Sequence, residues 1–92
     1  MVTAFVLVEA RRDMIPQTAQ ELTKLDGVAE VYSVAGQHDL VAIIRVKNND
    51  DLADLVTKHM LKVDGIIKSE TLIAFQVYSR HDLEAMFSIG EK

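Results

Sequence analysis

The segment Gly36-Gln37-His38-Asp39 is where residue types and spacing in this chain suggest binding chemistry. A turn that begins with glycine exposes backbone N–H groups that can hold a small carboxylate. An acidic side chain three residues later can pair with an ammonium group, so the two together suit an α-amino acid. The alternative is a plain hairpin turn, in which Gly36 supplies the backbone angle and Asp39 hydrogen-bonds to local amides. The sequence leaves both interpretations open.

Other kinds of chemistry have little local support. The three histidines, His38, His59 and His81, form no close metal-ligand spacing, and the chain has no cysteine. It also contains no GxSxG, Walker-type or GxGxxG pattern, the signatures of hydrolases and nucleotide-binding proteins. We expect His59 to be a buried or rim residue of an apolar helix stripe and His81 to be a surface residue. No cofactor and no metal ion are expected.

The charge balance argues against a nucleic-acid partner. The formal net charge is −4, and the ten Lys and Arg are spread along the chain, whereas a nucleic-acid surface needs a basic cluster. The opening apolar run, Val2–Val8, lacks a basic leader and is far too short to span a membrane. We therefore expect a cytoplasmic protein with no membrane contact.

Periodicity predicts the elements that position the turn. Residues 3–10 are rich in β-forming types and predict a strand, and an apolar stripe predicts a helix from about Asp13 to Leu25. Asp13 is expected to cap this helix, and Gly27 to close it. Strands are predicted at 28–35 and at 40–46, and their short separation favours an antiparallel hairpin with the Gly36–Asp39 turn at its tip.

The second half of the chain repeats this order. Residues 48–51 can cap a second helix that runs to about Val63, Gly65 stops it, and residues 66–78 predict the fourth strand. The Asp-Gly pairs at 26–27 and 64–65 lie 38 residues apart (64 − 26), a period that indicates two copies of one β-α-β unit. The predicted fold is α+β, a ferredoxin-like βαββαβ antiparallel sheet with two helices on one face.

The strands do not alternate between apolar and polar residues, as the runs Phe5–Val8 and Leu40–Ile44 show. Both faces of the sheet therefore require burial, but two helices can cover only one. The second face is expected to meet another protein, most simply a second copy around a two-fold axis, as in dimeric α+β barrels. The bulky residues assigned to that face are Phe5, Leu7, Ile43, Ile44 and Phe75.

The last residues are assigned to a tail outside the main domain. We divide the chain into a domain at 1–79 and a C-terminal tail at 80–92. The segment 79–87 reads as a short helix with capping-box residues at its start. It could pack on its own domain or contact a partner subunit.

Two segments resemble the ligand-binding domain of the Lrp/AsnC family, also called the regulation-of-amino-acid-metabolism domain. The first, VAEVYSVAGQHDLVAIIRV, contains a strand-Gly-x-x-Asp-strand pattern from Val31 to Val46. The second, VDGIIKSETLIAF, contains a pattern in which an Asp-Gly helix stop is followed by a strand that reaches Thr71. The resemblance covers about residues 2–78.

This resemblance implies a domain that dimerises through its sheets, with dimers assembling into rings such as octamers. It also implies that small effectors, usually amino acids, bind between dimers close to the Gly-x-x-Asp turn. The effector-binding residues carried over by motif are Gly36, Gln37, His38, Asp39 and Thr71, with Val34 and Ile73 as walls. Full-length members carry an N-terminal helix-turn-helix, whereas Met1 here leads directly into the first strand. A stand-alone effector domain is therefore expected, one that does not bind DNA itself and that acts by sensing a metabolite or by associating with a full-length relative.

Three alternatives stay open. An enzyme of the dimeric α+β barrel type, similar to a monooxygenase or isomerase, would use His38 and Asp39 to move protons. An ACT domain shares the topology, and an oligomer with no ligand is a third interpretation. If the turn does bind an effector, an imidazole at His38 would make ligand preference sensitive to pH near neutrality.

Overall fold

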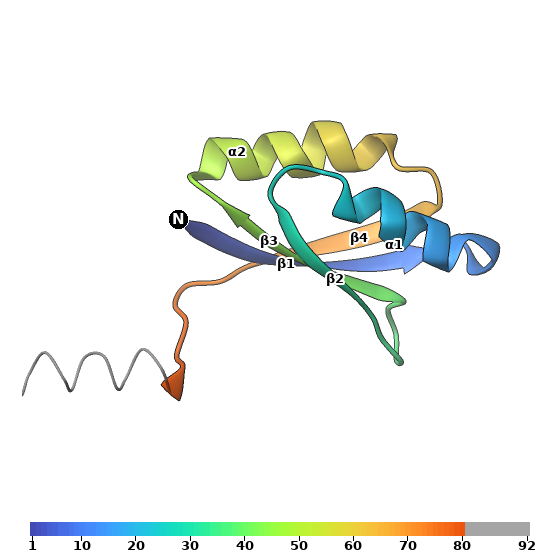
Figure 1. Ribbon diagram of the computed structural model, residues 1–92, viewed down its shortest axis with the longest axis horizontal. Helices are drawn as coiled ribbons and strands as arrows, with labels where there is room; N and C mark the ends of the chain where they lie inside the picture. The colour runs from blue at the N-terminus through green and yellow to red at the C-terminus, as the bar shows by residue number, and fades with distance from the viewer. Residues whose placement is uncertain (81–92) are drawn as a thin grey trace, which may run out of the picture.

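The structure, a computed structural model, describes residues 1–80 and shows an antiparallel sheet with two helices on one face (Figure 1). The strands follow the order β2-β3-β1-β4 across the sheet. They are β1 (Val2–Ala10), β2 (Val28–Ser33), β3 (Leu40–Val46) and β4 (Ile66–Ile73). Helix α1 (Ile15–Thr23) joins β1 to β2, and α2 (Asn49–Asp54) begins the connection from β3 to β4. The predicted ferredoxin-like α+β fold is confirmed.

The hydrophobic core lies between the sheet and the two helices. On β1 every second residue is buried, because successive side chains of a strand point to opposite faces. The core residues are Ala4, Val6, Val8 and Ala10 of β1, Leu40, Ala42 and Ile44 of β3, Leu22 of α1, and Leu52, Leu55 and Met60 of the second helical segment. The prediction for Ile44 was wrong: it is fully buried against the helices, since it lies opposite Ala4, which is also fully buried.

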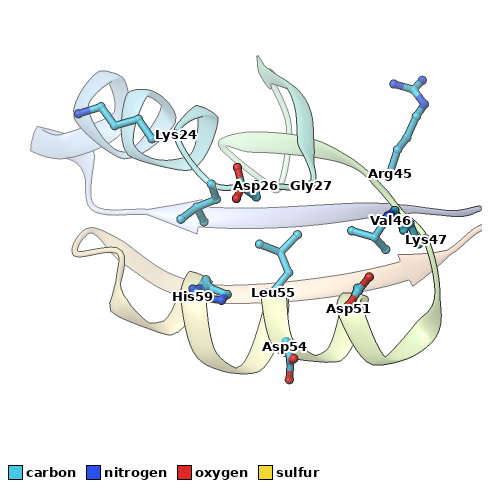
Figure 2. A pocket seen from close by; sticks show the side chains of 11 residues that line it. Lys24, Asp26, Gly27, Arg45, Val46, Lys47, Asp51, Asp54, Leu55 and His59 are labelled. Carbon is cyan, nitrogen blue, oxygen red and sulfur yellow. The ribbon is translucent and has the colours of Figure 1, made fainter.

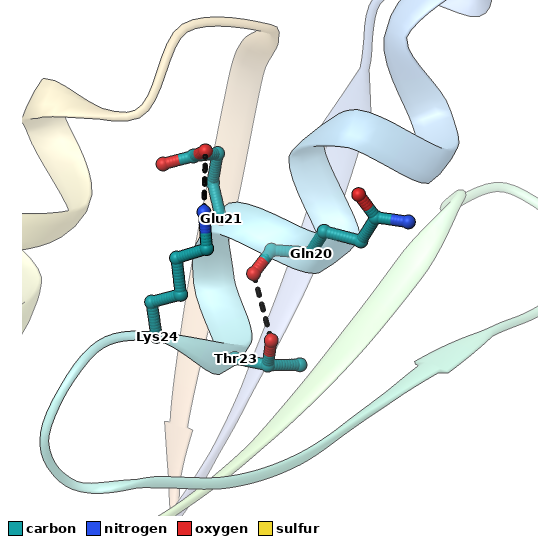
Figure 3. A network of polar contacts seen from close by, with 4 residues as sticks. All are labelled: Gln20, Glu21, Thr23 and Lys24. Atoms are coloured by element: carbon teal, nitrogen blue, oxygen red, sulfur yellow. Dashed lines mark hydrogen bonds and ion pairs between the residues drawn. The ribbon is translucent and has the colours of Figure 1, made fainter.

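Helix α1 begins later than the sequence suggested. A 3-10 turn at Arg12–Met14 precedes it and contains Asp13, and the residue before the helix makes no side-chain cap hydrogen bond, so the predicted Asp13 cap was wrong. Local contacts support the last turn (Figure 3): the Thr23 hydroxyl donates to the carbonyl oxygen of Gln20 at 2.7 Å, and Lys24 Nζ lies 3.4 Å from Glu21 Oε1. The exit turn follows at Gly27.

The second helical segment continues well beyond α2. The Asn48 side chain caps it by accepting a hydrogen bond from the backbone N–H of Asp51 at 2.8 Å. A π-helical stretch at Leu55–His59 and a 3-10 turn at Met60–Lys62 extend it, as the long coil above the sheet in Figure 1 shows. Gly65 then turns the chain into β4 with φ of 95°. Within residues 1–80 no helix is long and apolar enough to cross a membrane.

Strand β4 ends at Ile73, so the predicted strand over 66–78 was too long. The last ladder-like contact is the hydrogen bond from the Ala74 N–H to the Thr3 carbonyl at 2.9 Å. The register places Val2, the first residue of β1, opposite Phe75, so β1 could pair with at most one more residue of its strand, and the chain leaves the sheet there. Phe75 is fully exposed on this departing segment. Strand β2 likewise ends at Ser33 rather than residue 35. All but the start of the predicted tail helix lies outside the described residues.

The face opposite the helices, which we call the open face, is divided along its length. Phe5 lies directly opposite Ile43 on one side and Leu72 on the other, so these three apolar side chains share the face. Toward the other end of β1, Glu9 lies opposite Lys68. The open face therefore has an apolar half and a charged half.

Candidate functional site

The turn between β2 and β3 projects from the sheet on the side away from the helices (Figure 1). A hydrogen bond from the Val34 N–H to the Asp39 carbonyl, 3.0 Å long, closes its base. Gly36 has φ of 131°, and a Cβ atom there would meet nothing within 4 Å. The glycine is therefore required for its backbone angle and not for close packing.

Asp39 ties this turn to the end of β1. Its N–H donates to the Val8 carbonyl at 2.9 Å, and its Oδ2 accepts a hydrogen bond from the Ala10 N–H at 2.9 Å. The β1–β4 pairing shifts register between Glu9 and Ala10, and the Asp39 carboxylate satisfies the Ala10 backbone donor at this irregularity. The carboxylate is thus held by a backbone amide of β1, 29 residues away in the sequence, and not by an amide of the turn itself.

A groove with a volume of about 690 Å³ opens beside the turn. Two turn residues line it together with residues from the neighbouring strands β1 and β4. The lining residues are Gln37, His38, Leu7, Glu9, Lys68, Ser69 and Glu70. Leu7 and Glu9 belong to the open face, and their partners in the β1–β4 ladder are Glu70 and Lys68. The groove therefore occupies the charged half of the open face.

The charged side chains of this groove have no partner among residues 1–80. Within the described part of the chain, no ion pair and no side-chain hydrogen bond engages Glu9, Lys68 or Glu70. His38 is half-buried, and its ring also forms no hydrogen bond in the described structure. These groups are available to a ligand of complementary charge.

Five of the seven predicted site residues do not line this groove. Thr71 lies opposite the fully buried Val6 and Ile73 lies opposite Ala4, so both belong to the helix side of β4. Val34, Gly36 and Asp39 shape the turn instead. Sequence reasoning missed Leu7, Glu9, Lys68 and Glu70. The antiparallel register of β1 with β4 could have found them. That register can be worked out once it is known which residues of each strand face the core.

A second groove, of about 630 Å³, lies on the helix side (Figure 2). Val46 and Leu55 form its apolar floor, while Lys24, Arg45 and Asp54 point away from one another around it. His59, expected in an apolar stripe, is an exposed residue of the rim. Because the charged groups do not converge, this groove suits a ligand less well than the groove at the turn. Within residues 1–80 no group of histidine and acidic side chains could hold a metal ion.

A polar cluster borders the apolar half of the open face at the outer strand. The Tyr32 hydroxyl donates to Glu30 Oε2 at 2.6 Å, and Arg45 Nη1 lies 4.0 Å from Glu30 Oε1. The hydrogen bond to Glu30 and the negative charge of that carboxylate raise the pKa of Tyr32 above its ordinary value.

Comparison with known proteins places this geometry in a family. Residues 3–83 match the family described as the Lrp/AsnC ligand binding domain. The crystal structure of TTHA0845 from Thermus thermophilus superposes with a TM-score of 0.81 and 44% identity, covering 87% of this chain and 100% of that one. An uncharacterised HTH-type transcriptional regulator of Pyrococcus horikoshii, PH0140, is 33% identical over 76 residues, which are 83% of this chain and 48% of that protein.

A more distant structure shows the same fold. The transcriptional regulator NMB0573 from Neisseria meningitidis, crystallised as an L-Met complex, has a TM-score of 0.77 at 16% identity, covering 86% of this chain and 53% of that one. The chain spans about half the length of the curated relatives it matches. Domains of this family oligomerise and bind small effectors, and the family is one of transcription regulators and not of enzymes. The chain belongs to the Lrp/AsnC ligand-binding domain family.

Proposed function

We propose that this chain is an effector-binding and oligomerisation module that binds an α-amino acid in the groove beside the β2–β3 turn. One observation carries the proposal: Glu9, Lys68 and Glu70 line that groove together, and none of them has a partner within the described part of the chain. An amino acid carries one ammonium and one carboxylate group, and the groove offers an opposite charge to each. Lys68 receives the carboxylate, and a glutamate receives the ammonium.

This assignment changes the role of Asp39. The sequence analysis assigned Asp39 to bind the ammonium group of the ligand, but in the structure its Oδ2 accepts a hydrogen bond from the Ala10 N–H. In the proposal Asp39 positions the turn, so that Gln37 and His38 form one wall of the groove, while the strands supply the charges. Thr71 and Ile73, on the helix side of the sheet, do not touch the effector.

The apolar half of the open face supports a dimer. Phe5 is 36% exposed and Leu72 46% exposed, large values for apolar residues in the middle of a sheet, and Ile43 lies beside them. In the proposal a second copy covers these residues around a two-fold axis, and dimers join into a larger ring such as an octamer. The groove lies at the end of this proposed interface, where a ligand bound to one subunit can change how that subunit contacts its neighbours.

The biological role proposed is cytoplasmic regulation. An effector held close to a subunit boundary stabilises the assembled form, because it binds that form more tightly than the separated subunits. The curated relatives are DNA-binding regulators, so the partner proposed for this domain is a full-length Lrp/AsnC regulator. In this account the chain transmits amino-acid levels to that regulator and carries out no reaction.

Thermal unfolding with each of the twenty amino acids at millimolar concentration tests the proposal. A ligand present at about 100 times its Kd adds about 2.7 kcal/mol of stability, which raises Tm clearly. We expect one or a few amino acids to raise Tm and to be recovered unchanged afterwards. No shift with any amino acid, or conversion of the ligand to a product, would contradict the proposal.

A further inference from the structure

We propose that the groove beside the turn selects a basic amino acid, with a second positive charge at the end of its side chain. The inference rests on the proposed function and adds the chemical class of the effector. It comes from a count of the groove's acidic residues, lysines and arginines: Glu9 and Glu70 contribute two negative charges and Lys68 one positive charge. The groove therefore carries a net charge of −1 (−2 + 1).

A neutral amino acid leaves this charge uncompensated. Its carboxylate pairs with Lys68 and its ammonium with one glutamate, so the other glutamate faces the ligand's apolar side chain. A basic amino acid supplies a second cation for that glutamate and brings the net charge of the complex to zero. An acidic amino acid adds a second negative charge and is rejected, because like charges brought close together oppose binding.

The arrangement of the three charges fits such a ligand. Glu9 lies directly opposite Lys68, and Glu70 lies directly opposite Leu7. Glu9 and Glu70 are thus diagonal neighbours on adjacent strands, about 7–8 Å apart at the backbone, a span that a flexible chain of four or five carbons can bridge. Leu7, opposite Glu70 and two residues before Glu9 on β1, adjoins both glutamates and offers an apolar surface for the methylene groups of that chain.

The ion pairs of the described residues lie outside this groove. The ion pairs of the described residues involve Arg11, Lys24, Arg45 and Lys58, none of which lines this groove. Glu9 and Lys68, although opposite each other, form no ion pair within 4 Å. The ligand therefore does not have to displace an existing ion pair to reach either group.

Isothermal titration calorimetry with matched ligands tests the inference. The probes are L-lysine, L-norleucine, which lacks only the side-chain amine, and cadaverine, which lacks only the carboxylate. We expect L-lysine to bind at least tenfold more tightly than either, a difference of about 1.4 kcal/mol. Binding of L-norleucine at equal affinity would overturn the basic-ligand class. Equal binding of cadaverine would overturn the contact between Lys68 and the carboxylate.

Charge-neutral variants assign the contacts. Glu70→Gln and Glu9→Gln should each weaken L-lysine, and at least one should remove the preference over L-norleucine. Lys68→Gln should weaken both amino acids about tenfold but should not weaken cadaverine, which has no carboxylate to lose and two positive charges that the more negative groove favours. Lys62→Gln, an exposed position outside the groove, is the control and should change nothing. Circular dichroism checks that each variant is folded. If the groove variants bind L-lysine as tightly as the control, the binding site is elsewhere and the inference is wrong.

The design separates two failures. If a neutral amino acid binds in the groove and loses affinity in Lys68→Gln, the proposed function stands and only the basic class is refuted. If none of the twenty amino acids binds, the proposed function itself is refuted.

Discussion

Replacement of Asp39 by alanine should destabilise the protein, because the carboxylate joins the β2–β3 turn to the end of β1. The substitution removes the acceptor for the Ala10 N–H, which lies 2.9 Å from Oδ2 in a partly buried position. A hydrogen bond to a charged group contributes about 1.5–3 kcal/mol. We therefore expect Asp39→Ala to lower the free energy of unfolding by about 2 kcal/mol, and Tm by roughly 8–16 °C for a domain of this size.

Asp39→Asn is the matched control, because the amide oxygen can still accept from the Ala10 N–H while the negative charge is lost. It should cost less than half as much as alanine, since the acceptor remains. Urea unfolding followed by far-ultraviolet circular dichroism measures both variants. Protein concentration must be held constant because unfolding of an oligomer is coupled to its dissociation.

The same pair separates a structural role from a binding role. If Asp39 only positions the turn, Asp39→Asn should bind amino acids with nearly unchanged affinity. A loss of binding in a stable Asp39→Asn protein would refute this reasoning and return the ammonium contact to Asp39. An Asp39→Ala protein as stable as the parent would refute the assignment of the Ala10 hydrogen bond.

Three further predictions follow from other contacts. Gly65→Ala should lower the free energy of unfolding, measured in urea, by about 2–4 kcal/mol, because φ at Gly65 is 95° and an added Cβ would overlap the buried Thr18 hydroxyl of α1. Gly36→Ala should cost only about 1–2 kcal/mol, because an added Cβ there meets no other atom. Equal costs for the two variants would contradict this reasoning. Tyr32 should ionise at higher pH than a free tyrosine in ultraviolet absorbance, and the transition should move down in Glu30→Gln. Because the folded state holds this proton more tightly, the stabilisation is complete below pH about 10 and is lost as pH rises through the folded-state pKa; an unchanged titration in Glu30→Gln would exclude the hydrogen bond as the cause. Phe5→Glu should weaken self-association in sedimentation without unfolding the domain, since Phe5 lies outside the core; an oligomer of unchanged stability would place the interface elsewhere.

The fold could be predicted because its signals are local and repeated. The Asp-Gly stops at 26–27 and 64–65 mark equivalent places in two β-α-β units, and the structure has a turn at each. Ile44 was misplaced because a continuous apolar run does not say which of its residues face the helices, and only pairing with β1 decides this. The end of β4 was misplaced for a related reason: β4 stops at Ile73, and the last backbone hydrogen bond to β1 is the one from Ala74 to Thr3, although the residues that follow include strand-forming types.

The site was harder to predict than the fold because it is built by strand pairing. The motif drew attention to the turn, and two of its residues, Gln37 and His38, line the groove. Glu9 and Lys68 are 59 positions apart (68 − 9), and only the β1–β4 register brings them opposite each other. Because of its residue type, Asp39 was expected to bind the ammonium group of a ligand. In the structure its carboxylate accepts a hydrogen bond from the Ala10 N–H, at the register shift of β1.

Native mass spectrometry, with and without L-amino acids, tests the central claim most directly because it reports subunit number and bound ligands together. The account predicts an even-numbered oligomer that gains whole numbers of amino acid molecules, at most one per subunit, and becomes more resistant to dissociation when loaded. A monomer that stays unliganded at millimolar amino acid would contradict both the interface on the open face and the effector groove beside it.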